Sequence, residues 1–364
     1  MKMKNLKLQT LLLMLFVSSV MILGSCKKDS TTTPVDGDKT ALNALIAESE
    51  ALANAATTAD YPQAAIDNFK ATLQTIKTTS ASVLTQAQIT NLITSLTEAK
   101  KTFASQQYGF IDESLYLVAG WHFDEGTGNI ATSYSAAAQV ATFTKGWTTL
   151  LGSAAAMPTW VTGVKGGKAI YLDNGAHLEV PYSPSFLPSN ISISAWIKND
   201  LQGWENNCIV SLNYWHGYKF ATQSVGKPLF TEWKVGGGAA DFDAGSGIVT
   251  PLVWTHVVVS LNSATKILTF YINGSLVNTF TESTDVGALT QSLSYVDGAY
   301  TYTPQPFLIG SFATDAEIAL HPDNFSWIST ANVASFKGAM DELKVYNTAL
   351  DAGQVGKLYN DEKP

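Results

Sequence analysis

The stretch Trp254–Val277, WTHVVVSLNSATKILTFYINGSLV, decides the fold. Its strongest local signal is FYINGSLV, because the pair Asn273-Gly274 suits a type I′ turn between two strands. Before this turn, Leu268 and Phe270 fall on one face of a strand, and the residues that alternate with them fall on the other. The stretch therefore predicts an antiparallel sheet built from tight hairpins.

Similar short runs, separated by turn residues, continue from about Tyr108 onward. The expected strands are Leu115–Phe123, Lys168–Leu172, His177–Val180, Ile191–Lys198, Cys208–Leu212, Leu229–Lys234, Trp254–Leu261, Ile267–Ile272, Leu276–Phe280, Phe307–Gly310 and Gly338–Tyr346. About a dozen antiparallel strands in roughly 250 residues predict a mainly β fold, a two-sheet jelly-roll sandwich. After the last strand, only a short helical turn is expected, around Asp351–Asn360.

Residues 38–107 have a different character, because they contain no glycine and repeat apolar residues at helical spacing. Thr85 and Gln88 form a capping-box pattern before the last of three expected helices. Three helices with short turns predict a small antiparallel bundle. The segment YPQAAIDNFKATLQTIKTTSASVLTQAQITNLITSLTEAKKTF resembles the FIVAR-type helical modules of bacterial surface proteins, which implies a spacer or an interaction module.

The beginning of the chain has the pattern of a secretory signal, with three lysines before a short apolar run over residues 1–25. The tetrapeptide Leu23-Gly24-Ser25-Cys26 resembles a bacterial lipobox, which implies that Cys26 carries the lipid. Residues 26–37 are polar and threonine-rich, so they are expected to form a flexible tether. These features predict a surface-exposed lipoprotein of the outer membrane, held in the cell envelope by acyl chains alone.

Charge and cysteine content exclude several classes of partner. Cleavage of the signal removes three of the 22 basic residues and none of the 30 acidic ones, which leaves a formal net charge of −11. Such a charge argues against nucleic acid and anionic lipid as partners. With Cys26 lipidated, only Cys208 remains, so no intrachain disulfide is expected. The five histidines never fall at zinc-site spacing.

Several separate motifs of the β region occur in a recognisable order. They are LVAGWHFDEGTGNIATSYS, VKGGKAIYLDNGAHLEVPYSPSF, SISAWIK, WTHVVVSLNSATKILTFYINGSLV, PFLIGS and FKGAMDELKVYNTALDAGQVGKLY. The series resembles the concanavalin A-like, laminin G-like domains of bacterial secreted proteins. This resemblance implies one jelly roll over residues 108–364, in which the opening strand lies near the closing strand that carries Asp341 and Glu342.

Two interpretations of Asp341 remain open. In the first, its carboxylate accepts hydrogen bonds from turn backbone near Gly126 and fixes the terminal strands, since a buried carboxylate needs donors. In the second, which the resemblance implies, Asp124 and Asp341 join turn carbonyls as ligands of a structural calcium ion. A catalytic pair of Asp341 and Glu342 is not expected, because neighbours on a regular strand point to opposite faces.

Carbohydrate sites on β-sandwiches combine flat aromatic rings with amides and carboxylates. The stretches GWENN (203–207), NYWHGYK (213–219) and HPDNFSW (321–327) offer this mixture. The expected carbohydrate-binding residues are Trp204, Asn206, Tyr214, Trp215, Tyr218 and Trp327. The predicted function is therefore binding of a polysaccharide or glycan without catalysis.

Two other classes of function remain as alternatives. The first is a protein-binding adhesion or structural domain, which a flat apolar patch would favour. The second is a glycoside hydrolase, in which Glu205, Glu232 or another carboxylate would have to converge with Asp241 or Asp243 in one cleft. The oligomeric state is left open.

Overall fold

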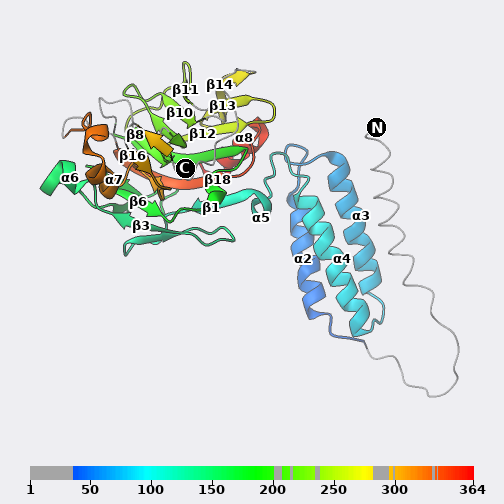
Figure 1. Ribbon diagram of the computed structural model, residues 1–364. Coiled ribbons are helices and arrows are strands. Elements are labelled where there is room, and N and C mark those ends of the chain that lie inside the picture. Colours follow the sequence, from blue (N-terminus) through cyan, green and yellow to red (C-terminus); the bar gives the residue numbers. More distant parts are fainter. Residues whose placement is uncertain are drawn as a thin grey trace. The chain divides into compact units, whose positions relative to one another are not determined.

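The computed structural model describes residues 36–200, 207–213, 216–233, 238–281, 295–297, 300–329, 333 and 335–364 (Figure 1). No helix in these ranges has the length and apolar character needed to cross a membrane.

The helical region consists of α2 (Thr40–Ala55), α3 (Gln63–Ser80) and α4 (Gln86–Ala104), as the sequence predicted. Each helix buries one apolar stripe, with Leu42 and Ile46 on α2, Leu73 on α3 and Leu96 on α4. The capping box before α4 is present, because the Thr85 backbone N–H donates to Gln88 Oε1 at 2.8 Å and the Gln88 N–H donates to Thr85 Oγ1 at 3.3 Å.

The β domain is a sandwich of two antiparallel sheets. The first sheet has the order β14 (Ser275–Thr281), β13 (Ile267–Ile272), β12 (Thr255–Asn262), β7 (Ile191–Asn199), β18 (Gly338–Tyr346), β5 (Lys168–Leu172) and β4 (Thr159–Thr162), and β1 (Leu117–Trp121) also pairs with β18. The second sheet has the order β11 (Ala239–Asp243), β10 (Pro228–Trp233), β9 (Tyr218–Thr222), β8 (Asn207–Leu212), β17 (Phe307–Ile309), β6 (His177–Val180), β3 (Val140–Thr144) and β2 (Ile130–Thr132). A separate hairpin pairs β15 (Tyr295–Asp297) with β16 (Tyr300–Tyr302).

All eleven expected strands are present, and the predicted mainly β sandwich is confirmed. The Asn273-Gly274 turn has φ of 50° and 74°, the positive pair that a type I′ turn requires. Five strands of the two sheets were not expected: β2, β3, β4, β9 and β11. None of them exceeds five residues, which leaves little room for a repeating pattern to stand out.

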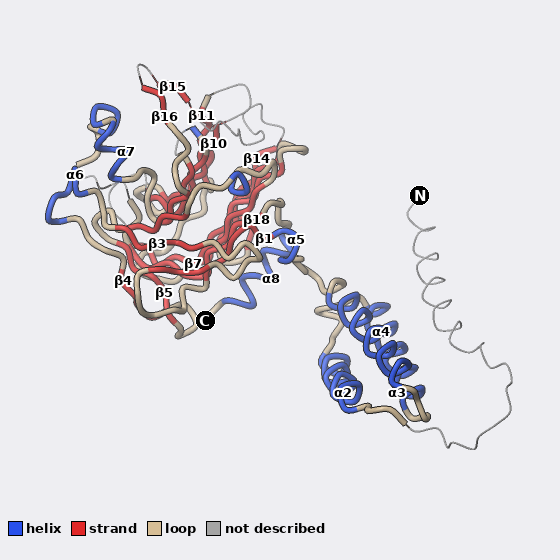
Figure 2. Tube along the Cα trace, turned by 60° about the horizontal axis from the view of Figure 1, so that its bottom comes forward, coloured by secondary structure: helices blue, strands red, loops and turns tan. Residues whose placement is uncertain are grey.

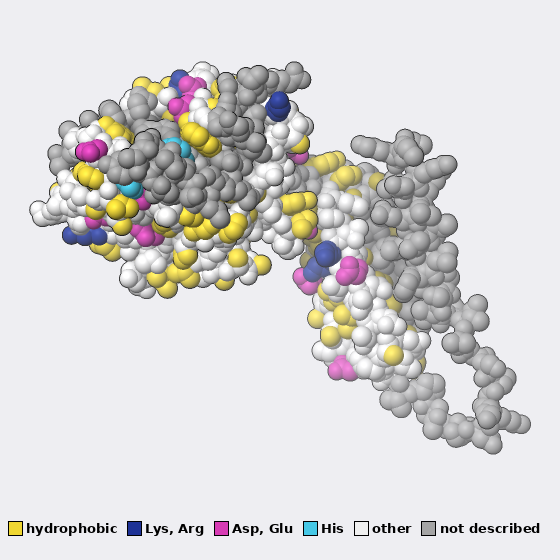
Figure 3. Space-filling view, in the orientation of Figure 1, with side chains coloured by type: hydrophobic (Ala, Val, Ile, Leu, Met, Phe, Trp, Pro, Cys, Tyr) yellow, Lys and Arg dark blue, Asp and Glu magenta, His cyan; other side chains and the backbone are white. Residues whose placement is uncertain are grey.

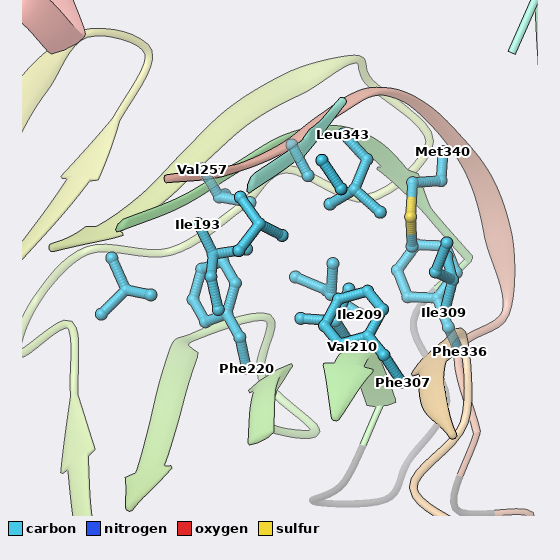
Figure 4. Close-up of a cluster of buried hydrophobic side chains, with 14 of the residues drawn as sticks. Ile193, Ile209, Val210, Phe220, Val257, Phe307, Ile309, Phe336, Met340 and Leu343 are labelled. Carbon is cyan, nitrogen blue, oxygen red and sulfur yellow. The ribbon is translucent and has the colours of Figure 1, made fainter. Parts of the chain in front are cut away.

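The core lies between the two sheets (Figure 4). The first sheet contributes Ile193, Val257 and Met340, and the second contributes Phe220 and Phe307, all fully buried. Phe307 also stacks on Phe186, with ring centroids 4.3 Å apart. Because apolar side chains occupy this space, the outer face of each sheet is the one that remains for polar side chains.

Short helices cover part of each outer face (Figure 2). Over the second sheet, α6 (Thr148–Leu151) and α7 (Asp315–Leu320) accompany an apolar cluster that includes Trp147, Cys208 and Phe312. Over the first sheet, α8 (Ala352–Glu362) packs Val355 and Leu358 against Val258 and Tyr346. The last element is thus an 11-residue helix and not merely the expected short turn. A further short helix, α5 (Glu113–Tyr116), precedes β1.

Candidate functional site

The acidic pair sits at an irregularity in β18. Asp341 pairs with Trp196 of β7, but the next paired residue, Ser194, faces Lys344, so β18 contains one extra residue. Glu342 occupies this bulge with a φ of 47°, in the left-handed region. On its other edge, β18 changes partner at the same place. Residues 338–340 pair with β5, and residues 343–346 pair with β1.

The bulge changes the direction of the side chains. Met340 and Leu343 are both in the core, so the two residues between them are kept out of it. Asp341 and Glu342 both line one open hollow of about 400 Å³, together with His122. The expectation that they point to opposite faces was therefore wrong, because it assumed a regular strand.

Asp341 binds the turn between β4 and β5. Its side chain is only 4% exposed. Oδ2 accepts a hydrogen bond from the Val164 backbone N–H and Oδ1 accepts one from the Glu342 N–H, both at 2.9 Å. Burial, together with the neighbouring charges of Glu342 and Asp124, raises the pKa of Asp341 to about 7. Asp341 thus accepts backbone hydrogen bonds as expected, but the turn that supplies one of them is at Val164 and not near Gly126.

Asp124 holds the other end of the same turn. Its Oδ1 accepts a hydrogen bond from the Lys168 N–H at 2.8 Å. The turn can approach both carboxylates because it contains glycine, since a Cβ at Gly163 would lie 2.6 Å from Asp341 Oδ2 and one at Gly167 would lie 2.4 Å from Asp124 Oδ1. The two aspartates therefore clamp residues 163–168 from opposite ends.

The calcium ion that was expected at Asp124 and Asp341 would have to share these carboxylates with backbone N–H groups of the turn. Calcium takes six to eight oxygen ligands, whereas the glycine-rich turn offers N–H donors to the two carboxylates. Within the described ranges, no three side chains of His, Cys, Asp or Glu are grouped so as to hold a metal ion. Calcium binding by this chain stays a prediction that only a titration tests.

Glu342 belongs to a chain of charged side chains along the outer face of the first sheet. Its Oε2 lies 2.8 Å from His122 Nδ1 and 2.8 Å from Lys344 Nζ. Lys344 also pairs with Glu362 of α8 at 2.5 Å, and Glu362 accepts a hydrogen bond from Trp196 Nε1 at 2.9 Å. Burial opposes ionisation of Glu342, but His122 and Lys344 outweigh it and lower its pKa to about 2.

The structure describes two of the six residues expected to bind carbohydrate. Trp204, Asn206, Tyr214 and Trp215 lie outside the described residues. Tyr218 is fully buried between the sheets, so its expected role in sugar stacking was wrong: the start of β9 turns this ring inward. Trp327 is half-buried, with its ring on Phe312 (centroids 5.4 Å apart) and its Nε1 bonded to Asn324 O at 3.0 Å.

The outer face of the second sheet carries a row of polar side chains. Ser211, Lys219, Thr231 and Asp241 lie directly opposite one another across β8, β9, β10 and β11. The adjacent row, which includes Phe230, points into the core, so the polar row faces away from the core. Three of its residues are nevertheless covered, since they are at most 3% exposed, and only Asp241 reaches the surface. The Thr231 hydroxyl donates to Asp241 Oδ1.

An aromatic pair stands at the end of this polar row. Trp233 is two residues after Thr231 on β10 and therefore on the same face. Its backbone N–H donates to Gly217 O at 2.7 Å, and its ring lies 4.7 Å from that of His216 at an angle of 30°. Both side chains are half-buried. Neither residue was among those expected to bind sugar, although His216 lies within the stretch NYWHGYK that indicated the region.

We call the polar row and the aromatic pair together the outer-face site: Ser211, His216, Lys219, Thr231, Trp233 and Asp241. Its accessible groups are the two half-buried rings and the exposed Asp241 carboxylate, whereas Ser211, Lys219 and Thr231 are buried. This is the mixture of groups that carbohydrate sites use.

Among the described residues, the carboxylates named for the hydrolase alternative do not converge. Asp241 lies opposite Thr231, so Glu232, the next residue on β10, points to the other face of the sheet. Asp243 pairs instead with Lys227 at 3.5 Å. Glu205 lies outside the described residues.

Comparison with known proteins agrees with this architecture. Residues 172–313 match a laminin G-type family model described as the concanavalin A-like lectin/glucanases superfamily. The β domain is thus a concanavalin A-like antiparallel sandwich. No curated protein matches the chain.

Solved structures that are similar to the chain include three binding domains or modules. One is the binding domain of Paraclostridial Mosquitocidal Protein 1, with 15% identity and a TM-score of 0.45 over 68% of this chain and 52% of that one. Another is domain 4 of AbnA, an extracellular arabinanase from Geobacillus stearothermophilus, in complex with arabinotriose, with 19% identity and a TM-score of 0.46 over 67% of this chain and 98% of that one. The third is the binding domain of Botulinum neurotoxin DC in complex with rat synaptotagmin II, with 12% identity and a TM-score of 0.46 over 70% and 53%. The chain spans about half the length of the first and third of these structures.

Proposed function

We propose that the β domain binds a polysaccharide or glycan, without catalysis, and that the outer-face site makes the contact. One observation carries the proposal: the half-buried Trp233 lies against His216 and is a diagonal neighbour of the exposed Asp241 on the same face of the second sheet. A ring can stack on the apolar face of a sugar while neighbouring hydroxyls and carboxylates bind its hydroxyl groups. The match to a family model whose description includes lectins supports the same function.

Binding to a glycan panel tests the proposal. The soluble chain from Lys27 onward is applied to immobilised polysaccharides, and the affinity for each binder is then measured in solution. Replacing Trp233 with alanine removes the stacking surface, so we expect a loss of about tenfold or more, as for a contact worth more than ~1 kcal/mol. Trp160→Ala is the matched control, because Trp160 is also half-buried but lies on β4 of the first sheet.

Two results would contradict the proposal. The first is that a folded chain binds no glycan at all, with folding checked by a cooperative melting transition. The second is that Trp233→Ala and Trp160→Ala weaken binding equally, which would remove the outer-face site as the contact.

A protein-binding role is the second candidate, and a different surface favours it. Val225, Ile248, Leu252 and Val253 are 51% to 60% exposed. Val225 belongs to the turn between β9 and β10, which accepts a hydrogen bond from the Val249 N–H through Gly226 O at 2.9 Å. Apolar side chains gathered on a surface are typical of protein contacts. Binding to glycans that is unaffected by Val225→Asp and Ile248→Asp would separate this surface from the sugar site.

We also propose that the chain is a lipid-anchored protein of the cell envelope, exposed at the outer membrane. The support is the sequence alone, namely the signal-like residues 1–25 and the lipobox-like tetrapeptide ending at Cys26. The polar residues 26–37 would then tether the folded domains to the membrane.

A further inference from the structure

The β domain is strongly acidic, and all its permanently basic side chains are lysines. Residues 108–364 contain 22 acidic residues and 12 lysines, a formal net charge of −10, and the whole chain contains no arginine. Arginine binds carboxylate, sulfate and phosphate groups through two parallel hydrogen bonds, which lysine cannot reproduce. Only scattered lysines appear on the face of the molecule shown in Figure 3.

Two lysines lie on the described strands and hairpins around the outer-face site: Lys219 is buried, and Lys227 has a side chain that is 25% exposed and paired with an aspartate. Lys219 is 3% exposed and lies across β10 from Asp241, with Thr231 between them. Burial lowers the pKa of Lys219, and this effect outweighs the opposing influence of Asp241. Lys227 follows the turn between β9 and β10 and pairs with Asp243.

Among the described residues of this site, the more exposed charges are negative. Asp241 is exposed at the edge of the polar row, and Asp243 is half-exposed two residues later on β11. An anionic sugar stacked on Trp233 would meet the carboxylate of its diagonal neighbour Asp241 within a few ångströms, where like charges repel by about 1–4 kcal/mol. The hydroxyls of an uncharged sugar would instead donate hydrogen bonds to the same carboxylate.

We infer that the ligand of the outer-face site is a neutral glycan, a polysaccharide without uronic acid, sulfate or phosphate groups. This inference rests on the proposed function, since it specifies the ligand of the same site. It excludes the acidic polysaccharides as a class.

A comparison of neutral and acidic polysaccharides tests the inference. Arabinan, xylan and mannan represent the neutral class, and polygalacturonate and heparin represent the acidic class. Affinity is measured at about 20 mM and about 500 mM salt, because screening weakens attraction between opposite charges. We expect binding to at least one neutral polysaccharide, with an affinity that changes less than about twofold between the two salt concentrations.

A charge reversal at the site makes the test sharper. Asp241→Lys removes the repulsion and adds a cation, so we expect it to gain salt-sensitive binding to an acidic polysaccharide. Asp323→Lys is the matched control, because it makes the same change in net charge on the exposed η4 turn (Pro322–Phe325). The control is expected to gain no such binding.

The outcomes separate the inference from the proposed function. Binding to acidic polysaccharides alone, weakened by salt, would overturn the inference and leave carbohydrate binding intact. Equal gains in binding to acidic polysaccharides by Asp241→Lys and Asp323→Lys would overturn the inference as well. Net charge, and not the outer-face site, would then determine which polysaccharides bind. No binding to any polysaccharide would contradict the proposed function and the inference together.

Discussion

Asp341 and Asp124 show how single residues fix the place where the two ends of the β domain meet. Each carboxylate takes a backbone N–H of the turn at residues 163–168, and the glycines of that turn leave room for the carboxylate oxygens. Asp341 therefore satisfies a buried backbone donor at Val164, and Asp124 holds the exposed end of the same turn at Lys168. Two predictions follow at the level of residues.

Gly163→Ala is expected to destabilise the fold by about 1–3 kcal/mol. Its Cβ would lie 2.4 Å from Lys168 O and 2.6 Å from Asp341 Oδ2, so the turn or the carboxylate has to move. Gly356→Ala is the matched control: it lies inside α8 with no atom within 4 Å of the new Cβ, and we expect a gain of about 0.5–1 kcal/mol. Urea unfolding of both variants measures this, and equal effects would show that the turn is not tightly packed.

Asp341→Ala is expected to cost more stability at pH 5 than at pH 8. The pKa of Asp341 is about 7 in the folded chain against an ordinary value of 3.8, so between these values the folded state holds a proton that the unfolded state releases. The contribution of Asp341 to stability is thus fully present at low pH and declines as pH rises toward 7. Urea midpoints of the wild type and the variant at both pH values measure the difference, and a difference independent of pH would contradict the assigned pKa.

The chemistry of these residues was only partly predictable. A buried carboxylate that binds turn backbone was one of two expected roles for Asp341, because any buried acid must find donors. The left-handed conformation of Glu342 was not predictable, since it depends on the change of partner strand along β18. Trp233 was also missed, because its place beside His216 results from the pairing of β9 with β10.

At the scale of elements, β18 and α8 organise the outer face of the first sheet. β18 pairs with β7 along its whole length and carries Lys344, whose charge is buried under α8. Burial disfavours the charge on Lys344, but the carboxylates of Glu362 and Glu342 outweigh it and raise the pKa of Lys344. The last turn of α8 is thus held by an ion pair as well as by apolar packing.

Lys344→Met is expected to destabilise the β domain by about 3–5 kcal/mol, because it leaves Glu362 and Glu342 without their buried counter-charge. The double variant Lys344→Met/Glu362→Met removes the charges of the ion pair between strand and helix together, so we expect it to be more stable than Lys344→Met alone. Chemical denaturation of the three proteins measures the coupling. Additive losses would indicate that the two groups do not interact.

The elements themselves were largely predictable. Long alternating runs such as Ile267–Ile272 show their period within a single strand, so all the expected strands are found. The strand β9 was missed because it has only five residues, too few for the alternation of Tyr218, Lys219 and Phe220 to stand out. The bulge in β18 was missed because a pattern of period two cannot reveal one inserted residue.

For the whole molecule, we propose that a lipid anchor holds a helical region and a sugar-binding sandwich at the membrane. Cys26→Ala is expected to abolish incorporation of a labelled fatty acid and to move the protein from the membrane fraction to the soluble fraction. The other cysteine provides the control, because Cys208 is fully buried and Cys208→Ala should leave labelling unchanged. Labelling that survives Cys26→Ala would contradict the anchor.

The central claim is that the outer-face site binds a neutral glycan, and the indole N–H signals of the tryptophans test it most directly. Selective ¹⁵N labelling gives one such signal for each of the nine tryptophans, assigned through single substitutions. On titration with neutral oligosaccharides from arabinan, xylan or mannan, we expect the chemical shift of the Trp233 signal to change in a saturable way and that of the Trp160 signal to stay constant. A saturable shift that spares Trp233, or no shift with any neutral oligosaccharide, would contradict the central claim.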